Sequence, residues 1–265
     1  MTHLLRLAIQ AGFEAGNEIM KIYEKDFSVE YKDDKSPLTE ADRVSNEIIC
    51  NHLQNTFPII SEENKRIDYE ERKNWASCWL IDPIDGTKEF IKKNGEFTVN
   101  IALIENEAPV LGVVYLPAKQ ILYFAEQTLG SYKYELGENA ELPEFDILIE
   151  KSQKLAGENL PRKYTIVASR SHMSPETEEF INDSKKKYGE VELISKGSSI
   201  KLCLVAEGSA HVYPRIAPTM EWDTAAAHAV AKYAGCSVLD FNEQTELKYN
   251  KEDLLNPYFI VTRER

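Results

Sequence analysis

The stretch that decides the fold is Trp79-Leu-Ile-Asp-Pro-Ile-Asp-Gly-Thr87. Its apolar run ends in Asp82, a proline stops the run, and a second carboxylate follows at Asp85. Gly86 and Thr87 then open a segment that can continue as a helix. Two acids on a tight turn at a strand end can hold a hard cation, and free N–H groups at a helix start can hold an anion. This pattern predicts a metal-dependent phosphatase.

Length and composition indicate an ordinary globular enzyme. The chain has 265 residues, enough for one large domain or two lobes, with 43% hydrophobic and 28% charged residues. Its formal charge of −13 excludes a nucleic-acid polymer as partner, because polymer binding needs a basic face. A small phosphorylated substrate remains compatible with that charge, since a bound divalent cation reverses the local sign.

Cysteine usage and hydropathy predict a cytoplasmic protein. The four cysteines lie far apart with no CxxC pair, so we expect reduced, mostly buried thiols. No run approaches the roughly 18 apolar residues that span a bilayer, and Arg6 and Gln10 interrupt any signal-peptide core. Peripheral association with the inner face of the membrane stays an alternative, although the acids of the first helix would repel anionic lipid.

The first half of the chain predicts two helices on an antiparallel sheet. Apolar residues recur at helical spacing between Leu4 and Ile22. Thr39 and Asp42 form a capping-box pattern for a second helix, which Pro58 ends. The expected strands are 59–60, 79–81, 97–104, 110–115 and 120–125.

The second half predicts alternating strands and helices. Residues 135–162 are rich in Gly, Pro, Asn and Glu and mark a lobe boundary, so we expect an α+β lobe at 1–150 and an α/β lobe at 151–265. Such alternation indicates a mixed or mainly parallel sheet covered by helices. The expected strands are 164–168, 190–194, 210–213, 237–240 and 258–261, and the expected helices are 175–187, 199–206 and 224–234.

Carboxylates recur at strand ends and helix starts: Glu62-Glu63, Asp82, Asp85 and Asp223. Taken singly, each has a simpler interpretation as a turn or cap residue. If they converge, each pair of charges about 4 Å apart repels by about 4 kcal/mol at an effective dielectric of about 20, so convergence implies cations. The histidines and cysteines lack zinc spacing, and all-oxygen ligation beside a phosphate favours Mg²⁺, as two or more ions.

The acid motif carries a family resemblance. Asp82-Pro-Ile-Asp-Gly-Thr87 together with Trp222-Asp223 resembles the inositol monophosphatase superfamily of Mg²⁺-dependent, lithium-sensitive phosphatases. Further stretches are similar to its 3'(2'),5'-bisphosphate nucleotidase branch, and the matches run in order along nearly the whole chain. They are Asp34-Lys-Ser-Pro-Leu-Thr-Glu-Ala-Asp42, Asp85-Gly-Thr-Lys-Glu-Phe90, Ser169-Arg-Ser-His172, Gly197-Ser-Ser-Ile-Lys-Leu-Cys-Leu-Val-Ala-Glu-Gly208 and Tyr213-Pro-Arg215.

The resemblance implies a two-lobed αβαβα layered sandwich with its site between the lobes. The metal ligands that it implies are Glu62, Asp82, Asp85, Asp223 and the backbone carbonyl of Ile84. The implied catalytic residues are Asp42 and Thr87, which orient and activate the attacking water, with Glu62 assisting. The implied substrate contacts are Ile84, Asp85, Gly86, Thr87 and Asp223 toward the phosphate, and Ser169, His172, Gly197 and Lys201 toward the nucleoside and its second phosphate. Arg215 is a further candidate for that phosphate.

These inferences predict a Mg²⁺-dependent phosphomonoesterase that hydrolyses adenosine 3',5'-bisphosphate to AMP and phosphate, clearing a by-product of sulfur metabolism. An inositol monophosphatase or sugar-bisphosphatase with the same metal site is the nearest alternative. A non-catalytic metal and polyphosphate sensor is an alternative of another class, which the water-activating pair Asp42 and Thr87 argues against. Association as a homodimer and the role of residues 128–161 stay open.

Overall fold

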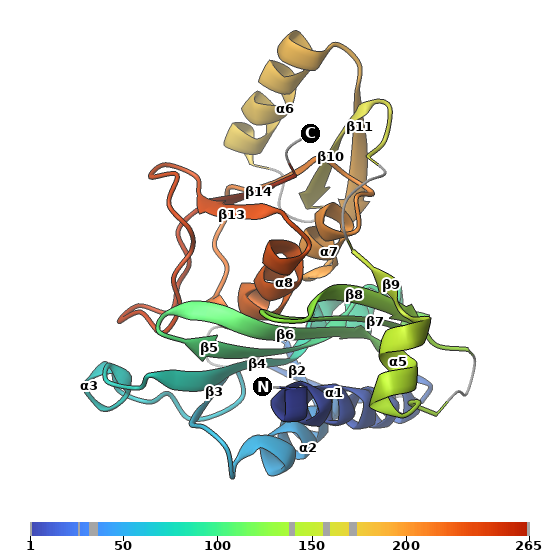
Figure 1. The fold of residues 1–265 in the computed structure, drawn as a ribbon, viewed down its shortest axis with the longest axis vertical. Helices are drawn as coiled ribbons and strands as arrows, with labels where there is room; N and C mark the ends of the chain where they lie inside the picture. Colours follow the sequence, from blue (N-terminus) through green and yellow to red (C-terminus); the bar gives the residue numbers. More distant parts are fainter. Residues whose placement is uncertain are drawn as a thin grey trace.

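Two sheets and their covering helices form five stacked layers, which confirms the predicted αβαβα sandwich (Figure 1). The computed structural model describes residues 2–25, 27–31, 37–137, 141–155, 160–169 and 174–263. From one side to the other, the layers are α1 (Thr2–Tyr23) with α2 (Glu40–Leu53), a seven-stranded sheet, α7 (Ile200–Ala206) with α8 (Glu221–Tyr233), a five-stranded sheet, and α6 (Pro175–Tyr188).

The seven-stranded sheet is antiparallel except at one edge, where β3 and β4 pair in parallel. In spatial order its strands are β3 (Ile59–Ser61), β4 (Ser77–Asp85), β5 (Thr98–Glu105), β6 (Ala108–Leu116), β7 (Ile121–Glu126), β8 (Gly130–Glu135) and β9 (Gln153–Lys154). The antiparallel meander was predicted. The parallel edge pair and the last two strands were not predicted. Residues 128–161 carry no motif that could be assigned, and the periodicity of residues 135–162 is weak.

Strand β4 is buried on both faces, which explains its continuous apolar run. Trp79 and Ile81 point into the core beneath α1 and α2, whereas Cys78 and Leu80 point into the core around α8. The expectation that its proline stops the strand was wrong. The strand continues to Asp85, and its pairing with β5 shifts register between Asp82 and Asp85. Because the regular hydrogen-bond ladder is already interrupted there, a proline, which has no N–H, can be accommodated.

Helix α8 lies between the two sheets and packs closely on the first one. Its alanine-rich sequence leaves little side chain between helix and strands. A Cβ added to Gly112 of β6 would lie 2.2 Å from the backbone oxygen of Ala226. This close approach places the N-terminal end of α8 beside the strand ends of the first sheet that carry Glu62 and Asp82.

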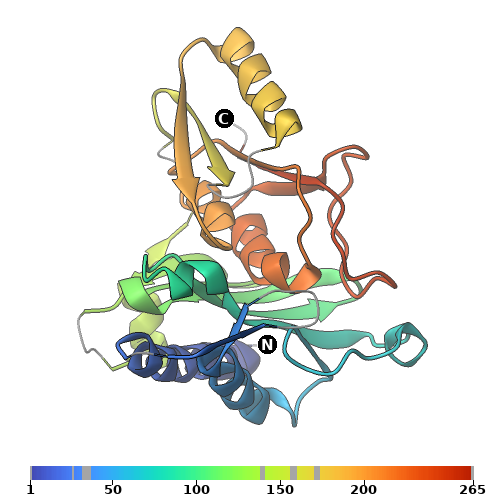
Figure 2. The ribbon, with the colours of Figure 1, turned by 180° about the vertical axis from the view of Figure 1, so that it is seen from behind.

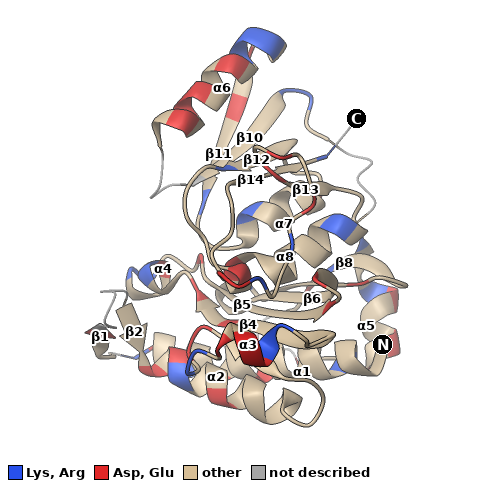
Figure 3. Ribbon diagram, turned by 90° about the vertical axis from the view of Figure 1, so that its left-hand side faces the viewer, with Lys and Arg blue, Asp and Glu red and all other residues tan. Residues whose placement is uncertain are grey.

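The five-stranded sheet is mixed, as predicted. In spatial order its strands are β11 (Val191–Lys196), β10 (Tyr164–Ser169), β12 (Val212–Arg215), β14 (Phe259–Thr262) and β13 (Ser237–Asp240). The pairs that β10 makes are parallel, and the pairs that β14 makes are antiparallel. Helix α6 covers its outer face through Ile181, with acids in its first turn and lysines in its last (Figure 3), which suits the helix dipole.

Shorter elements join the layers (Figures 1 and 2). They are the pair β1 (Val29–Tyr31) and β2 (Pro37–Thr39), the helices α3 (Tyr69–Arg72), α4 (Thr87–Ile91) and α5 (Phe145–Lys151), and the 3-10 turn η1 (Pro117–Lys119). Within the described ranges, no helix combines the length and apolar character that crossing a membrane requires. The division into lobes at residues 150 and 151 stays a prediction.

We predict that Gly112→Ala destabilises the protein by about 1–3 kcal/mol, because the added methyl group must push α8 away from β6. Chemical denaturation followed by circular dichroism measures the change. Gly137→Ala is the matched control, since no atom lies within 4 Å of the added carbon. Equal stability of the two variants would contradict the close packing of α8.

Candidate active site

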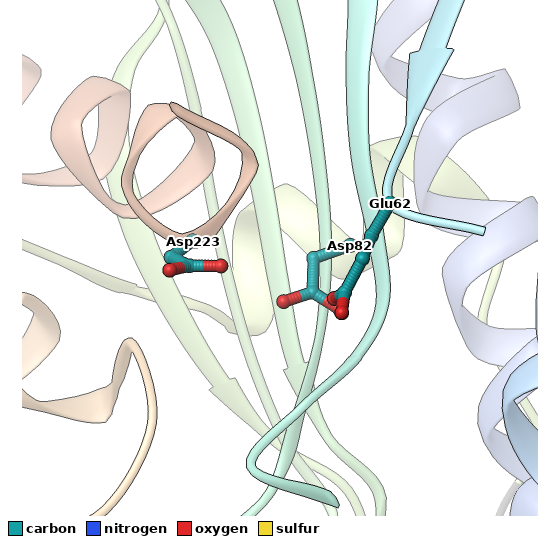
Figure 4. Close-up of side chains that lie close together, drawn as sticks. All are labelled: Glu62, Asp82 and Asp223. Carbon is teal, nitrogen blue, oxygen red and sulfur yellow. The ribbon is translucent and has the colours of Figure 1, made fainter. Parts of the chain in front are cut away.

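Three carboxylates from distant parts of the sequence meet in one place (Figure 4). Glu62 follows β3, Asp82 lies on β4, and Asp223 lies in the first turn of α8. One oxygen of each lies within 4.8 Å of the others. Like charges at this spacing repel strongly unless protons or cations intervene. Their role as metal ligands stays a prediction, but the structure places them as that role requires.

Backbone hydrogen bonds hold each of these acids in place. The Glu62 N–H donates to the Ile81 carbonyl at 3.2 Å, which fixes the residue against β4. Asp82 Oδ1 accepts from the Ile84 N–H at 3.0 Å, and Asp223 Oδ2 accepts from the Met220 N–H at 2.9 Å. The last bond closes a cap at the start of α8. Asp223 therefore caps its helix and faces the other acids at the same time.

The residues after Asp82 line the same cleft. The Asp85 carboxylate accepts a hydrogen bond from the Ser199 N–H, and it is not one of the three acids that meet within 4.8 Å. Gly86 adopts φ +95°, a conformation that suits glycine, and this turns the chain from β4 into α4. The Ile84 carbonyl accepts from Thr87 Oγ1 at 3.3 Å. The predicted ligand roles of Asp85 and Ile84 stay predictions.

Asp42 and Thr87, which lie 45 residues apart, are brought together beside the acids. Asp42 is 2% exposed, and its Oδ2 accepts from the Thr39 N–H at 2.7 Å and from Thr39 Oγ1 at 2.6 Å. Its Oδ1 lies 3.4 Å from Thr87 Oγ1. The capping box predicted from sequence thus doubles as the support of a carboxylate that points at a cleft hydroxyl.

The electrostatics of the acids favour binding of a positive charge. Burial, followed by the charges of Glu62 and Asp85, raises the pKa of Asp82 well above its ordinary value. Burial, and then Asp85, raises the pKa of Asp223 to about 8, and burial raises that of Asp85 to about 6 although Lys201 opposes it. Carboxylates that repel one another are the donor set of a hard divalent cation, so these residues fit a site for such an ion.

Basic residues line the other side of the cleft, whose volume is about 430 Å³. Burial lowers the pKa of Lys201 to about 8, and its ammonium lies 5.6 Å from the centre of the Tyr213 ring. Arg215 is 8% exposed and donates to the Pro218 carbonyl at 2.8 Å. Gly197 also lines the cleft, and a Cβ there would lie 2.9 Å from a side-chain carbon of Glu89.

Two other predicted contacts cannot be placed. The backbone of Ser169 ends β10, and nothing is described of its side chain. His172 lies outside the described residues. Their predicted contacts with the nucleoside stay predictions.

Sequence reasoning missed the polar residues that tie the chain between β11 and α7 to the first sheet. Ser199 Oγ lies 2.9 Å from Thr98 Oγ1 and donates to Asn100 Oδ1 at 2.8 Å. The buried Glu96 accepts from Lys196 Nζ at 3.0 Å and from the Gly197 N–H at 3.1 Å. Gly197-Ser-Ser199 was the only signal in the sequence, and it does not indicate which residues of the first sheet these residues contact.

The family model described as the inositol monophosphatase family matches residues 1–264. The chain belongs to the inositol monophosphatase family. Within this family it is 42% identical to the 3'(2'),5'-bisphosphate nucleotidase CysQ of Salmonella typhimurium over 264 residues, covering 98% of this chain and 99% of that protein. The CysQ protein of Escherichia coli K12 is 40% identical over the same share of each chain.

Solved structures of the family agree with this assignment. The crystal structure of CysQ from Bacteroides thetaiotaomicron superposes with a TM-score of 0.90 at 52% identity, covering 99% of this chain and 98% of that one. The suhB protein of Bartonella henselae superposes with a TM-score of 0.76 at 22% identity, covering 99% and 94%. The second likeness supports the fold alone. As a member of this family, the chain is a phosphatase.

We predict that Asp82→Asn makes the metal-free protein more stable at pH 8.5, by on the order of 1–3 kcal/mol. The raised pKa values mean that the folded acids bind protons more tightly than the unfolded ones. Stability of the metal-free wild type therefore falls as pH rises through about 6 to about 8, and the variant loses less of it. Urea unfolding with EDTA at pH 6 and 8.5 measures both effects.

The exposed Glu243→Gln is the control for a general change in net charge. Added Mg²⁺ should raise the stability of the wild type and of Glu243→Gln, and should leave Asp82→Asn unchanged. A metal-free Asp82→Asn protein that unfolds at the same urea concentration as the wild type at pH 8.5 would show that repulsion among the acids is unimportant.

Proposed function

We propose that the chain is a Mg²⁺-dependent 3'(2'),5'-bisphosphate nucleotidase that hydrolyses adenosine 3',5'-bisphosphate to AMP and phosphate. One observation carries the proposal: the converging acids and the buried basic side chains of Lys201 and Arg215 line the same cleft. A substrate with two phosphates on one ribose needs both a metal site and a separate basic site. The names of the relatives that share 40–52% of their residues with this chain support the same substrate.

The acids fit the metal part of this reaction. Glu62, Asp82 and Asp223, joined by Asp85 and the Ile84 carbonyl, would hold two or more Mg²⁺ ions. When bound, these ions supply positive charge that makes a water molecule more acidic and neutralises the phosphoryl oxygens. The raised pKa values of the free acids are consistent with this role, because a carboxylate that is costly to ionise alone gains most from a cation.

Asp42 and Thr87 would control the attacking water. Because the Asp42 carboxylate is anchored by two donors from Thr39, its other oxygen is aimed at Thr87 Oγ1. The threonine can pass its proton to that carboxylate and accept one from the water. The water oxygen forms the new P–O bond, and the ribose 3' oxygen leaves with a proton from solvent.

Backbone and basic groups would place the substrate. The N–H groups of Gly86 and Thr87 lie at the start of α4 and are suited to the phosphoryl oxygens. Lys201 and Arg215 lie within the cleft and are suited to the 5'-phosphate through charge-assisted contacts. Gly197 lines the same cleft and is suited to a contact with the nucleoside.

We predict that phosphate release with Mg²⁺ is faster from adenosine 3',5'-bisphosphate than from inositol 1-phosphate, by at least tenfold in kcat/KM. Only the adenosine bisphosphate carries a second phosphate, the 5'-phosphate, that can pair with the basic side of the cleft. A malachite-green assay on both substrates measures the ratio. Faster turnover of the inositol ester would favour the monophosphatase alternative, and no turnover of either would favour a sensor.

We also predict that Thr87→Ala lowers kcat by about 10²–10⁴ with little change in KM, because the alanine cannot relay the water proton. Thr87→Ser keeps the hydroxyl and should retain activity within about tenfold of the wild type. Steady-state kinetics at saturating Mg²⁺ compares the three proteins. Equal activity of the alanine and serine variants would remove Thr87 from the mechanism.

A further inference from the structure

The two outer metal-ligand candidates, Glu62 and Asp223, belong to segments that are separated by a second cavity. This cavity has a volume of about 380 Å³. One wall is formed by the chain that follows β3, including Glu62 and Arg72, and the other by the start of α8, including Met220 and Trp222. Within this cavity the two walls do not pack on each other, so contacts at its border contribute to the spacing of the two acids.

A buried arginine bridges this gap. Arg72 lies at the end of α3, is 2% exposed, and its Nη1 donates to Asn250 Oδ1 at 2.8 Å and to the Lys251 carbonyl at 2.6 Å. Its Nη2 donates to the Glu252 carbonyl at 2.9 Å. In return, Asn250 Nδ2 donates to the Arg72 carbonyl at 3.0 Å. Figures 1 and 2 show the segment after β13 reaching down beside the first sheet, on the side where α3 lies.

The same turn is tied to the start of α8. Glu221, two residues before Asp223, is fully buried, and its carboxylate accepts from the Asn250 N–H at 2.6 Å and from the Lys251 N–H at 3.1 Å. It also pairs with the Lys251 ammonium. The Glu221 N–H donates to the Leu254 carbonyl at 2.9 Å. The first turn of α8 is thus held by the segment that Arg72 holds.

Buried charges of this kind are costly when their partners are lost, so the arrangement is rigid. Asn250 adopts φ +61°, which asparagine tolerates, and in this conformation its backbone faces Glu221 while its side chain faces Arg72. Three segments of the sequence therefore form one connection from the chain after β3 to the start of α8.

We propose that Arg72, Asn250 and Glu221 form a clamp that sets the spacing between Glu62 and Asp223 and so tunes the affinity of the metal site. The clamp residues are positioning residues, because none of them is among the three acids that meet. The proposal rests on the proposed function in that the metal site serves the phosphatase reaction. Partners that orient metal ligands typically change metal affinity by 10–100-fold when they are removed.

The decisive variant is Asn250→Gly. Glycine adopts φ +61° without strain, so the backbone turn is kept while the two hydrogen bonds between the Asn250 side chain and Arg72 are lost. The bonds from Arg72 to the Lys251 and Glu252 carbonyls remain, so this variant weakens the clamp without removing it. Arg72→Lys is the second variant, since it keeps the charge but cannot reach three acceptors at once. Lys248→Ala is the matched control: it removes an exposed ion pair to Glu107, 2.9 Å long, that links the same segment to the first sheet.

Metal affinity is measured without substrate, by titrating the full chain with Mn²⁺ and following the free ion by electron paramagnetic resonance. We expect Asn250→Gly to weaken Mn²⁺ binding about tenfold and Arg72→Lys to weaken it at least as much. The Mg²⁺ concentration for half-maximal phosphate release should rise by the same factor, while kcat at saturating Mg²⁺ stays within about threefold of the wild type. Lys248→Ala should match the wild type within twofold.

A clamp that is merely structural would lower the melting temperature of Asn250→Gly and leave Mn²⁺ binding unchanged, which would overturn the proposal. Equal weakening in Lys248→Ala would overturn it too. If Arg72→Lys does not fold, Asn250→Gly decides alone. A wild type that binds Mn²⁺ without hydrolysing adenosine 3',5'-bisphosphate would reject the nucleotidase activity, and the Mn²⁺ titration would still test the clamp.

Discussion

Mutual repulsion among buried carboxylates is the constraint on which the rest of the structure depends. Glu62, Asp82 and Asp223 come from a strand end, a strand and a helix start, and the fold holds their oxygens within 4.8 Å of one another. Such a group opposes folding until a cation joins it. The surrounding packing therefore has to be strong enough to impose the site on the chain.

That packing comes from layers that approach one another closely. Strand β4 is buried on both faces, so its acidic end cannot shift without disturbing two cores. The alanines of α8 and Gly112 of β6 let a helix lie almost directly on the sheet. Asp223 is carried to the acids by this contact, and its own cap bond to the Met220 N–H keeps it pointed inward. Site geometry thus rests on core packing, to which the proposed clamp adds a direct connection between the Glu62 segment and the start of α8.

The sequence predicted most of the fold because its periodicities are strong. The first helix, the meander after residue 97 and the alternation after residue 164 all follow from apolar spacing. The acids were found because each stands at an expected strand end or helix start. The continuation of β4 past its proline was missed, since a bulge cannot be read from one strand alone. The bonds of Ser199 and Arg72 were missed for a related reason: their partners lie about 100 and about 180 residues away, and nothing local marks them.

Helix α8 belongs to both halves of the molecule. Its alanines share one continuous core with Leu80 and Ala102 of the first sheet and with Tyr213 and Val261 of the second. Rotating one sheet against the other would break these contacts, so the shared core opposes a hinge motion between the two sheets. A substrate must therefore enter and leave the cleft without a large rotation of one sheet against the other.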